Sequence, residues 1–334
     1  MLKGHGNGGF ERLKDRFIGS SLGTFVGDAM GRPVEGWTFQ MIQTVYGLLG
    51  EVEQGIYTDD TEMMIGIMES LVEQPRFDPV VTARKFLDNF NPRRGYGGRI
   101  FGVMDRLRCG VVWDKAGTDS WGNGGAMRVA PIGFFYYDTP EDLVKAAHDG
   151  AFITHQHPLG IAGAVAQATA VGLATLKGIR GEAVAVTEFV DPIAETVAPI
   201  SKEMAEGVGI VKEIQRGTDL KETVSHIASD FPCDVSALGA VPPALAAFLL
   251  TEDFREALVV AVNCGGDTDT IGAMTGAIAG AYYGCGQIPD RWIACLEDGV
   301  RGKGYVVSLA ERLAYIKRDQ GLEDRRFPDR SNDD

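Results

Sequence analysis

The sequence predicts an all-α protein, a compact orthogonal bundle of helices around a central cleft. Helix-type patterns of apolar residues recur along nearly all of its 334 residues. Alternating strand patterns are scarce, and residues 133–137 (Gly-Phe-Phe-Tyr-Tyr) form the segment with the strongest strand character. Glycine is abundant, at 44 residues, and recurs at intervals of four in two of the predicted helices. These three observations together favour densely packed helices.

Gly, Pro, Asn and Asp residues mark most of the gaps between the predicted helices. In chain order the predicted helices are 17–27, 61–72, 79–90, 141–152, 161–176, 194–215, 220–228, 241–250, 254–262, 271–283 and 305–317. The fifth is the most apolar, but it carries Gln167 and Thr169 and consists mostly of Ala and Gly. It is shorter than the run of about 18 apolar residues that a membrane span needs, so we expect a buried helix and no membrane partner.

The first and tenth predicted helices each carry glycines along one face. Residues four apart lie in line on a helix, and each glycine costs roughly 1 kcal/mol of helix propensity relative to alanine. Close packing against another helix, or a ligand near the backbone, must offset that cost. The glycines concerned are Gly19, Gly23 and Gly27 in one helix, and Gly272, Gly276, Gly280 and Gly284 at the other.

Composition excludes several classes of protein. The charge balance of 32 basic against 46 acidic residues gives a net charge of −14, which argues against a nucleic-acid or anionic-membrane binder. Five cysteines without CxxC spacing indicate reduced thiols rather than a zinc site or a disulfide framework. No signal peptide is visible at the amino terminus, so we expect a cytoplasmic protein. No linker divides the chain, which predicts one domain over residues 1–318 and a charged, disordered tail over 319–334.

Two aspartate clusters, each at the start of a predicted helix, are the most informative feature of the chain. The clusters are Thr58-Asp59-Asp60-Thr61 and Asp267-Thr268-Asp269-Thr270. Either could serve as a helix cap, since Asp59 and Glu62 have capping-box spacing and Asp269 precedes a helix. A cap needs one acceptor, however, and surplus carboxylates repel one another unless a cation joins them. Carboxylates and hydroxyls are ligands for Mg²⁺ or Mn²⁺, so the repeated surplus favours a pair of hard cations.

Three further motifs surround these clusters in the sequence. Asp28 and Glu35 lie in a Gly- and Pro-bounded loop after the first helix, where they either join a metal centre or face a substrate, or form a plain C-cap and solvated loop. Residues 120–128 (Ser-Trp-Gly-Asn-Gly-Gly-Ala-Met-Arg) form a Gly-rich turn without the Rossmann spacing. Its amide groups suit phosphates and Trp121 offers a flat face, although a plain tight turn fits equally well. Residues 154–158 hold two histidines, one of which we expect to face a substrate and one to be structural, although a plain loop fits equally well.

Taken together, five segments resemble the ADP-ribosylglycohydrolase family. They match in order and span residues 19 to 284, most of the chain. The segments are 27–31 with Glu35, 58–61, 120–128, 154–155 and 265–270. The resemblance implies an all-α fold, a binuclear magnesium or manganese site in the central cleft, and cleavage of the bond between C1″ of ADP-ribose and an acceptor.

The resemblance also implies roles for individual residues. Thr58, Asp59, Asp60 and Asp269 would hold one ion, and Asp267, Asp269 and Thr270 the other, with Asp269 bridging. Glu35 matches the family's mobile acidic residue near the scissile bond. The ligand would be lined by Asp28, Ser120, Trp121, Gly122, Asn123, Gly124 and His155. Trp121 stands where some members have tyrosine, which leaves open the preference on the adenine side or for the linkage.

The resulting expectation is a metal-dependent hydrolase of ADP-ribose conjugates. Asp60 or Asp267 would deprotonate the water and Glu35 would steer the anomeric end or protonate the leaving group, through an oxocarbenium-like transition state. Arginine is favoured as the acceptor, and serine or a small conjugate remains open. Two alternatives are an aspartate-nucleophile phosphatase, since Asp267-Thr268-Asp269 follows an apolar run at 259–262, and a non-catalytic ADP-ribose-binding protein.

Overall fold

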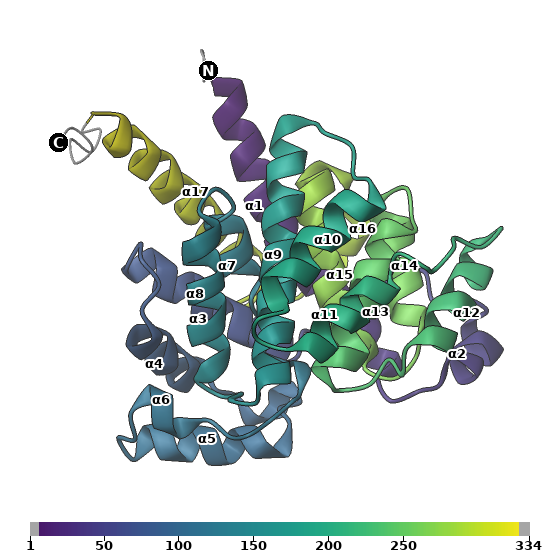
Figure 1. The fold of residues 1–334 in the computed structure, drawn as a ribbon, viewed down its shortest axis with the longest axis horizontal. Coiled ribbons are helices and arrows are strands. Elements are labelled where there is room, and N and C mark those ends of the chain that lie inside the picture. The colour runs from purple at the N-terminus through teal and green to yellow at the C-terminus, as the bar shows by residue number, and fades with distance from the viewer. Residues whose placement is uncertain (1–6, 327–334) are drawn as a thin grey trace.

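The computed structural model describes the chain from Asn7 to Arg326 (Figure 1). Over this range the structure consists of α-helices, short 3-10 turns and loops, and isolated β-bridges replace any strand. The predicted all-α fold is therefore confirmed. The helices are α1 Asn7–Gly31, α2 Phe39–Tyr46, α3 Asp59–Glu73, α4 Pro79–Asn89, α5 Gly98–Arg108, α6 Trp113–Ala116, α7 Ala130–Phe135, α8 Pro140–Phe152, α9 Pro158–Arg180, α10 Val186–Val197, α11 Lys202–Ile210, α12 Leu220–Asp230, α13 Ala237–Leu249, α14 Phe254–Asn263, α15 Thr268–Tyr283, α16 Asp290–Cys295 and α17 Lys303–Arg326.

Helix α9 runs through the middle of the molecule (Figure 1). It packs against α7, α8, α10, α13 and α15. Its length and apolar composition would allow it to cross a membrane, but 83% of its most apolar window is buried inside the protein. Packing on all sides removes the need for a polar face, which is why this helix reads as continuously apolar.

The two glycine-bearing helices pack against each other along the whole seam between α1 and α15. A Cβ on Gly23 would lie 2.0 Å from the carbonyl oxygen of Gly276, and one on Gly27 would lie 2.0 Å from that of Gly272. Both distances are far below van der Waals contact, so backbone meets backbone at these positions. Gly19 pairs with Gly280 in the same way. The pairing is antiparallel, and it sets the end of α1 beside the start of α15.

The structure corrects three predicted elements. The expected strand at 133–137 lies mostly in α7, whose six residues are all buried, so its aromatic run reflects burial rather than strand pairing. The helix predicted over 194–215 is two helices, because Ser201 caps α11 by accepting a hydrogen bond from Met204 N (3.2 Å). The last helix continues to Arg326, through the first half of the predicted tail, and residues 327–334 lie outside the described residues.

Candidate active site

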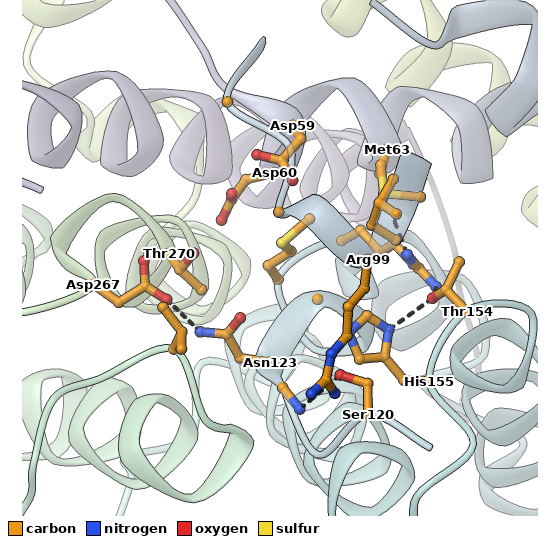
Figure 2. Close-up of a pocket in the computed structure, with 18 of the residues that line it drawn as sticks. Asp59, Asp60, Met63, Arg99, Ser120, Asn123, Thr154, His155, Asp267 and Thr270 are labelled. Carbon is orange, nitrogen blue, oxygen red and sulfur yellow. Dashed lines mark hydrogen bonds between the residues drawn. The ribbon is translucent and has the colours of Figure 1, made fainter. Parts of the chain in front are cut away.

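One cleft collects the starts of three helices and two loops (Figure 2). Its volume is about 410 Å³, within the range of small-molecule sites. The walls come from the starts of α3, α5 and α15, from the turn around Asn123 and from the loop that carries His155. All the metal-ligating residues predicted from the sequence line this cleft: Thr58, Asp59, Asp60, Asp267, Asp269 and Thr270. Segments that are distant in the chain therefore meet at one place.

The start of α3 presents Asp59 and Asp60 to the cleft. Thr58, and not Asp59, is the N-cap, since its hydroxyl accepts from Asp60 N (3.4 Å) and donates to Asp60 Oδ2 (3.1 Å). The other oxygen of Asp60, Oδ1, is buried and has no hydrogen-bond partner within the described range of the chain. Burial, followed by the charge of Asp28, raises the pKa of Asp59 to about 8 and that of Asp60 well above its usual range. The two carboxylates are thus not occupied by capping the helix.

Asp28 proves to support the site from behind, which corrects its predicted place against the substrate. It is fully buried on α1 and lies outside the lining of the cleft. Its oxygens accept hydrogen bonds from Thr58 N (2.9 and 3.0 Å), Thr61 N (3.1 Å) and Thr61 Oγ1 (2.6 Å). Asp28 therefore fixes the first turn of α3, and with it the positions of the two cleft-facing aspartates.

The start of α15 presents Asp267, Asp269 and Thr270. Asp267 is the N-cap residue but makes no capping hydrogen bond, and its Oδ2 accepts instead from Asn123 Nδ2 (2.5 Å). Asp269 Oδ1 accepts from Thr270 N (2.9 Å). Burial raises the pKa of both aspartates, with the charge of Asp60 adding to the effect on Asp269. Capping therefore does not explain this cluster either.

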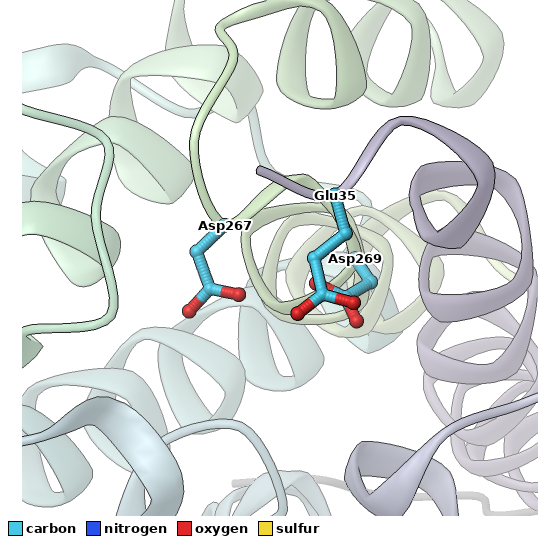
Figure 3. Close-up of side chains that lie close together, drawn as sticks. All are labelled: Glu35, Asp267 and Asp269. Carbon is cyan, nitrogen blue, oxygen red and sulfur yellow. The ribbon is translucent and has the colours of Figure 1, made fainter. Parts of the chain in front are cut away.

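Glu35 joins these two aspartates (Figure 3). Oxygens of Glu35, Asp267 and Asp269 all lie within 4.8 Å of one another, and Glu35 is the exposed member of the three. Although the residue as a whole is exposed, partial burial of its carboxyl group, and then the charge of Asp267, raises the pKa of Glu35. Three carboxylates at such distances require either protons or a cation between them.

Backbone hydrogen bonds join the loop that carries Glu35 to the loop at Gly265 and Gly266, directly before α15. Gly36 N donates to Gly266 O (2.7 Å), and Gly266 N donates to Trp37 O (2.8 Å). Gly265 and Gly266 have φ values of 83° and 72°, a backbone region that glycine adopts most readily. A Cβ on Gly266 would lie 1.7 Å from the carbonyl oxygen of Cys233. Glycine is therefore required here, and two backbone hydrogen bonds hold the chain next to Glu35.

The donor set fits hard divalent cations. Every side-chain ligand offered by the two clusters is an oxygen, and the buried Asp60 Oδ1 has no hydrogen-bond partner among the residues that the structure describes. Carboxylate and hydroxyl oxygens suit Mg²⁺ and Mn²⁺, whereas softer metals favour thiolate or imidazole. The residues that the structure brings together are thus the oxygen ligands that such cations prefer.

Residues 120–124 form the wall of the cleft that faces the start of α3, and this wall carries no carboxylate. Ser120, Trp121, Gly122, Asn123 and Gly124 line it, and Trp121 remains 45% exposed. The turn is pinned to a loop near α13 because Asn123 N donates to Val235 O (3.0 Å) and Ala237 N donates to Trp121 O (3.0 Å). The amide of Asn123 is used in this way, but the glycines at 124 and 125 carry no side chain that would shield the rest of the turn from a ligand, so this wall suits an anion.

His155 adds a neutral donor to the same wall. Burial, then the charges of Arg128 and Arg99, lowers the pKa of His155 to about 3. Its Nδ1 lies 2.7 Å from the hydroxyl of Thr154, which already accepts from Arg128 Nη2 (2.7 Å). We assign the Thr154 hydroxyl as the donor and His155 Nδ1 as the acceptor, because the other possible acceptor, Ala151 O, is farther away at 3.5 Å. Nε2 then carries the hydrogen beside Gly124, where a Cβ would lie 3.0 Å from Nε2.

The second histidine of the motif has the structural role expected of one of the pair. His157 is the N-cap of α9, and its Nδ1 accepts from Leu159 N (3.1 Å). Sequence reasoning missed Arg99, which lies at the start of α5 and lines the cleft. The preceding Gly95, Gly97 and Gly98 disguise the start of this helix, and no motif marks the arginine.

Comparison with known proteins agrees with this arrangement. The family model described as ADP-ribosylglycohydrolase matches residues 10–322. The chain belongs to the ADP-ribosylglycohydrolase family. Its membership makes it a glycosidic-bond hydrolase that acts on ADP-ribose conjugates.

Several members of the ADP-ribosylglycohydrolase family are similar over most of their length. An uncharacterised protein of Archaeoglobus fulgidus is 34% identical, with 90% of this chain and 96% of that protein covered. ADP-ribosylhydrolase ARH3 of Homo sapiens is 31% identical, with 85% of this chain and 90% of the relative covered. A solved structure titled ADP-ribosylglycohydrolase-related protein complex superposes with a TM-score of 0.73 at 28% identity, covering 92% of this chain and 99% of that one.

Both alternative functions considered for the sequence fall away for this ADP-ribosylglycohydrolase. An aspartate-nucleophile phosphatase places its Asp-x-Asp motif after a strand of an α/β fold, but here Asp267 follows the helix α14 and a short loop. A non-catalytic reader has no need of so complete an acidic set, and the relatives named ARH3 are hydrolases.

Proposed function

We propose that the chain hydrolyses the bond between C1″ of ADP-ribose and an acceptor with the help of two Mg²⁺ or Mn²⁺ ions. The observation that carries the proposal is the convergence of Asp59 and Asp60 with Asp267 and Asp269 in one cleft, opposite a wall suited to phosphate. None of these four carboxylates caps its helix through a side-chain hydrogen bond. The arrangement is costly without cations, so cation binding is what explains it.

The ligand sets follow from the two helix starts. Thr58, Asp59, Asp60 and Asp269 would hold one ion, and Asp267, Asp269 and Thr270 the other, with Asp269 shared. Bound ions of this kind polarise the substrate and lower the pKa of a water molecule. Asp28 supports the first set by holding the turn that contains Thr58 and Thr61.

Two carboxylates would be candidates to accept the proton of the attacking water. Asp60 Oδ1 has no hydrogen-bond partner among the described residues, and Asp267 lines the cleft with its Oδ2 oriented by Asn123 Nδ2. Glu35 approaches from the exposed side of the cleft, where it would steer the anomeric carbon or donate a proton to the departing acceptor. The wall around Asn123 and His155 would hold the diphosphate and exclude water from that side, while the transition state gains oxocarbenium character.

Arginine is the acceptor that we propose first. The exposed carboxylate of Glu35 attracts a cationic group at the acceptor side of the cleft, which favours a guanidinium-bearing side chain over serine. As the bond between C1″ and the guanidinium nitrogen breaks, arginine would leave as a neutral guanidine and take up a proton to become guanidinium. The oxygen of the attacking water would form the new bond to C1″, and ADP-ribose would remain on the cleft wall.

The test is a panel of ADP-ribosylated arginine peptide, ADP-ribosylated serine peptide and a small ADP-ribose conjugate. Each is incubated with the purified protein after exhaustive chelation and again after Mg²⁺ or Mn²⁺ is restored. We expect release of ADP-ribose only in the presence of a cation, and fastest from arginine. Full activity in chelator would refute the cation site, and faster release from serine would refute the choice of acceptor.

A further inference from the structure

The cleft has two cationic side chains in its lining, and they have different surroundings. Arg128 is fully buried, donates to Thr154 Oγ1 (2.7 Å) and Gly150 O (2.9 Å), and lies over the ring of Phe86 at 4.7 Å. Both of its terminal nitrogens therefore bond to the protein, while the buried Nε makes no hydrogen bond among the described residues. Arg99 is exposed, and it extends from the first turn of α5 toward Ser120 and His155 (Figure 2).

The guanidinium of Arg99 has no partner among the described residues. Three nearby arginines have partners: Arg94 with Glu297, Arg106 with the carbonyl of Ala116, and Arg108 with Asp105. Arg93 has none among the described residues, but it lies outside the cleft, so Arg99 is set apart by its place in the lining. Arginine carries five donors in a planar fork that matches phosphate oxygens. A guanidinium left unpaired on the wall of a ligand cleft is thus available to an anion.

The charge of the cleft favours an anion-binding group at this end. Glu35, Asp59, Asp60, Asp267 and Asp269 bring five carboxylates, and two divalent cations would bring four positive charges. A diphosphate placed beside this site would meet a residual negative charge. The start of α5 adds a favourable partial charge, since Gly97 and Gly98 leave the first amides of that helix uncovered.

We propose that Arg99 binds the diphosphate of the ligand and determines the preference for diphosphate-bearing conjugates over compounds that offer only ribose. The inference rests on the proposed function, because it takes the ribose to lie on the carboxylate end of the cleft. The diphosphate then lies beside Ser120, the Gly122–Gly124 turn and His155, within the wall that Arg99 completes. His155 donates a neutral hydrogen bond there, and Arg99 supplies the positive charge.

The test compares Arg99→Ala and Arg99→Lys with Arg93→Ala in the full chain with Mg²⁺ present. Arg93 is an exposed arginine of the preceding 3-10 turn and lies outside the cleft, so its removal matches the loss of charge without touching the site. Affinities for ADP-ribose and for ribose are measured by calorimetry or competition, and Mg²⁺ affinity is measured separately.

We expect Arg99→Ala to weaken ADP-ribose binding by about ten- to a hundredfold, the range for a charged hydrogen bond, and to leave ribose and Mg²⁺ binding unchanged. Arg99→Lys keeps the charge and loses the fork, so an intermediate loss is expected, and the affinity of the alanine variant should fall less steeply with added salt. Turnover of Arg99→Ala should show a raised KM with a kcat close to that of the wild type.

Two outcomes overturn the inference. One is ADP-ribose affinity of Arg99→Ala within twofold of both the wild type and Arg93→Ala. The other is an equal loss of affinity for ribose and ADP-ribose, which would make Arg99 a general support of the cleft. A wild-type protein that neither binds ADP-ribose nor cleaves its conjugates refutes the proposed function as well, whereas a wild type that cleaves them beside an unaffected Arg99→Ala refutes this inference alone.

Discussion

Replacing Asp269 by asparagine is expected to stabilise the cation-free protein and to weaken the cation-loaded one. Asp269 is 4% exposed, and oxygens of Asp269, Asp267 and Glu35 lie within 4.8 Å of one another. At that distance and an effective dielectric constant of about 20, two unit charges repel by roughly 3.5 kcal/mol. The asparagine keeps the oxygen that accepts from Thr270 N, so the change removes charge and little else.

Proton uptake limits the gain. Burial and the neighbouring charges raise the pKa of Asp269, so at neutral pH the cation-free wild type holds protons that relieve part of the repulsion. We therefore expect the variant to gain about 2 kcal/mol in free energy of unfolding in chelator, below the full repulsion of one pair. The folded state binds more protons than the unfolded state above the unfolded pKa near 4, so the cation-free wild type loses stability as pH rises, and the advantage of the variant grows.

With cations the order reverses. A ligand at a hundred times its dissociation constant adds about 2.7 kcal/mol of stability, and the variant forfeits most of this because its shared ligand is neutral. The assay is urea unfolding in chelator and in excess Mg²⁺, with Asp78→Asn as control, since Asp78 caps α4 away from the cleft and asparagine caps equally well. Equal stability of wild type and Asp269→Asn in both conditions would refute the cation site, and a loss in chelator would make Asp269 a structural residue.

Three further changes test other parts of the molecule. Gly276→Ala should lower the free energy of unfolding by about 2 kcal/mol, because a Cβ there would lie 2.0 Å from Gly23 O. The control Gly209→Ala has open space around its Cβ and should raise the free energy of unfolding by up to about 1 kcal/mol. Urea midpoints of the two variants that move in the same direction would contradict the α1–α15 seam. His155→Gln should make stability less sensitive to acid, because the imidazole gains a proton near pH 6.5 in the unfolded state and only near pH 3 in the folded state. Between pH 7 and 4.5 the wild type should therefore lose roughly 2.5 kcal/mol of stability relative to the variant. Parallel pH profiles in guanidinium unfolding would show that the ring is not buried in its neutral form. Glu35→Ala should lower the single-turnover rate by several orders of magnitude while calorimetry shows ADP-ribose affinity nearly unchanged, and an equal loss of both would make Glu35 a binding residue.

Features written locally in the sequence were the ones that could be predicted. The four-residue glycine spacing predicts two closely packed helix faces, and the structure shows that these two faces pack against each other. The surplus of acidic residues in both clusters was readable because a helix cap uses one acceptor. Thr58 takes the capping role in the first cluster, which leaves Asp59 and Asp60 for the cleft.

Features that depend on tertiary contacts could not be predicted from the sequence. Asp28 follows the same kind of loop signal as Glu35, yet its surroundings on α1 direct it to the backbone of α3 and away from the cleft. The aromatic run of α7 resembles a strand, since a fully buried helix has no polar face to mark its period. Arg99 lies in no motif, and it lines the cleft only because the fold brings the start of α5 close to the turn at Ser120.

The order of synthesis adds a constraint on how this protein becomes active. Asp60 leaves the ribosome long before Asp267, and at about 5–20 residues per second the intervening chain takes roughly 10–40 s to make. Through that interval the nascent chain exposes the glycine face of α1 without α15, and it holds only half of the acidic cluster. Bound cations would therefore gain their full ligand set only after Thr270 has been made, and a product that stops before Gly266 has neither the seam nor the complete acidic cluster. We expect such fragments to depend on chaperones or to be degraded.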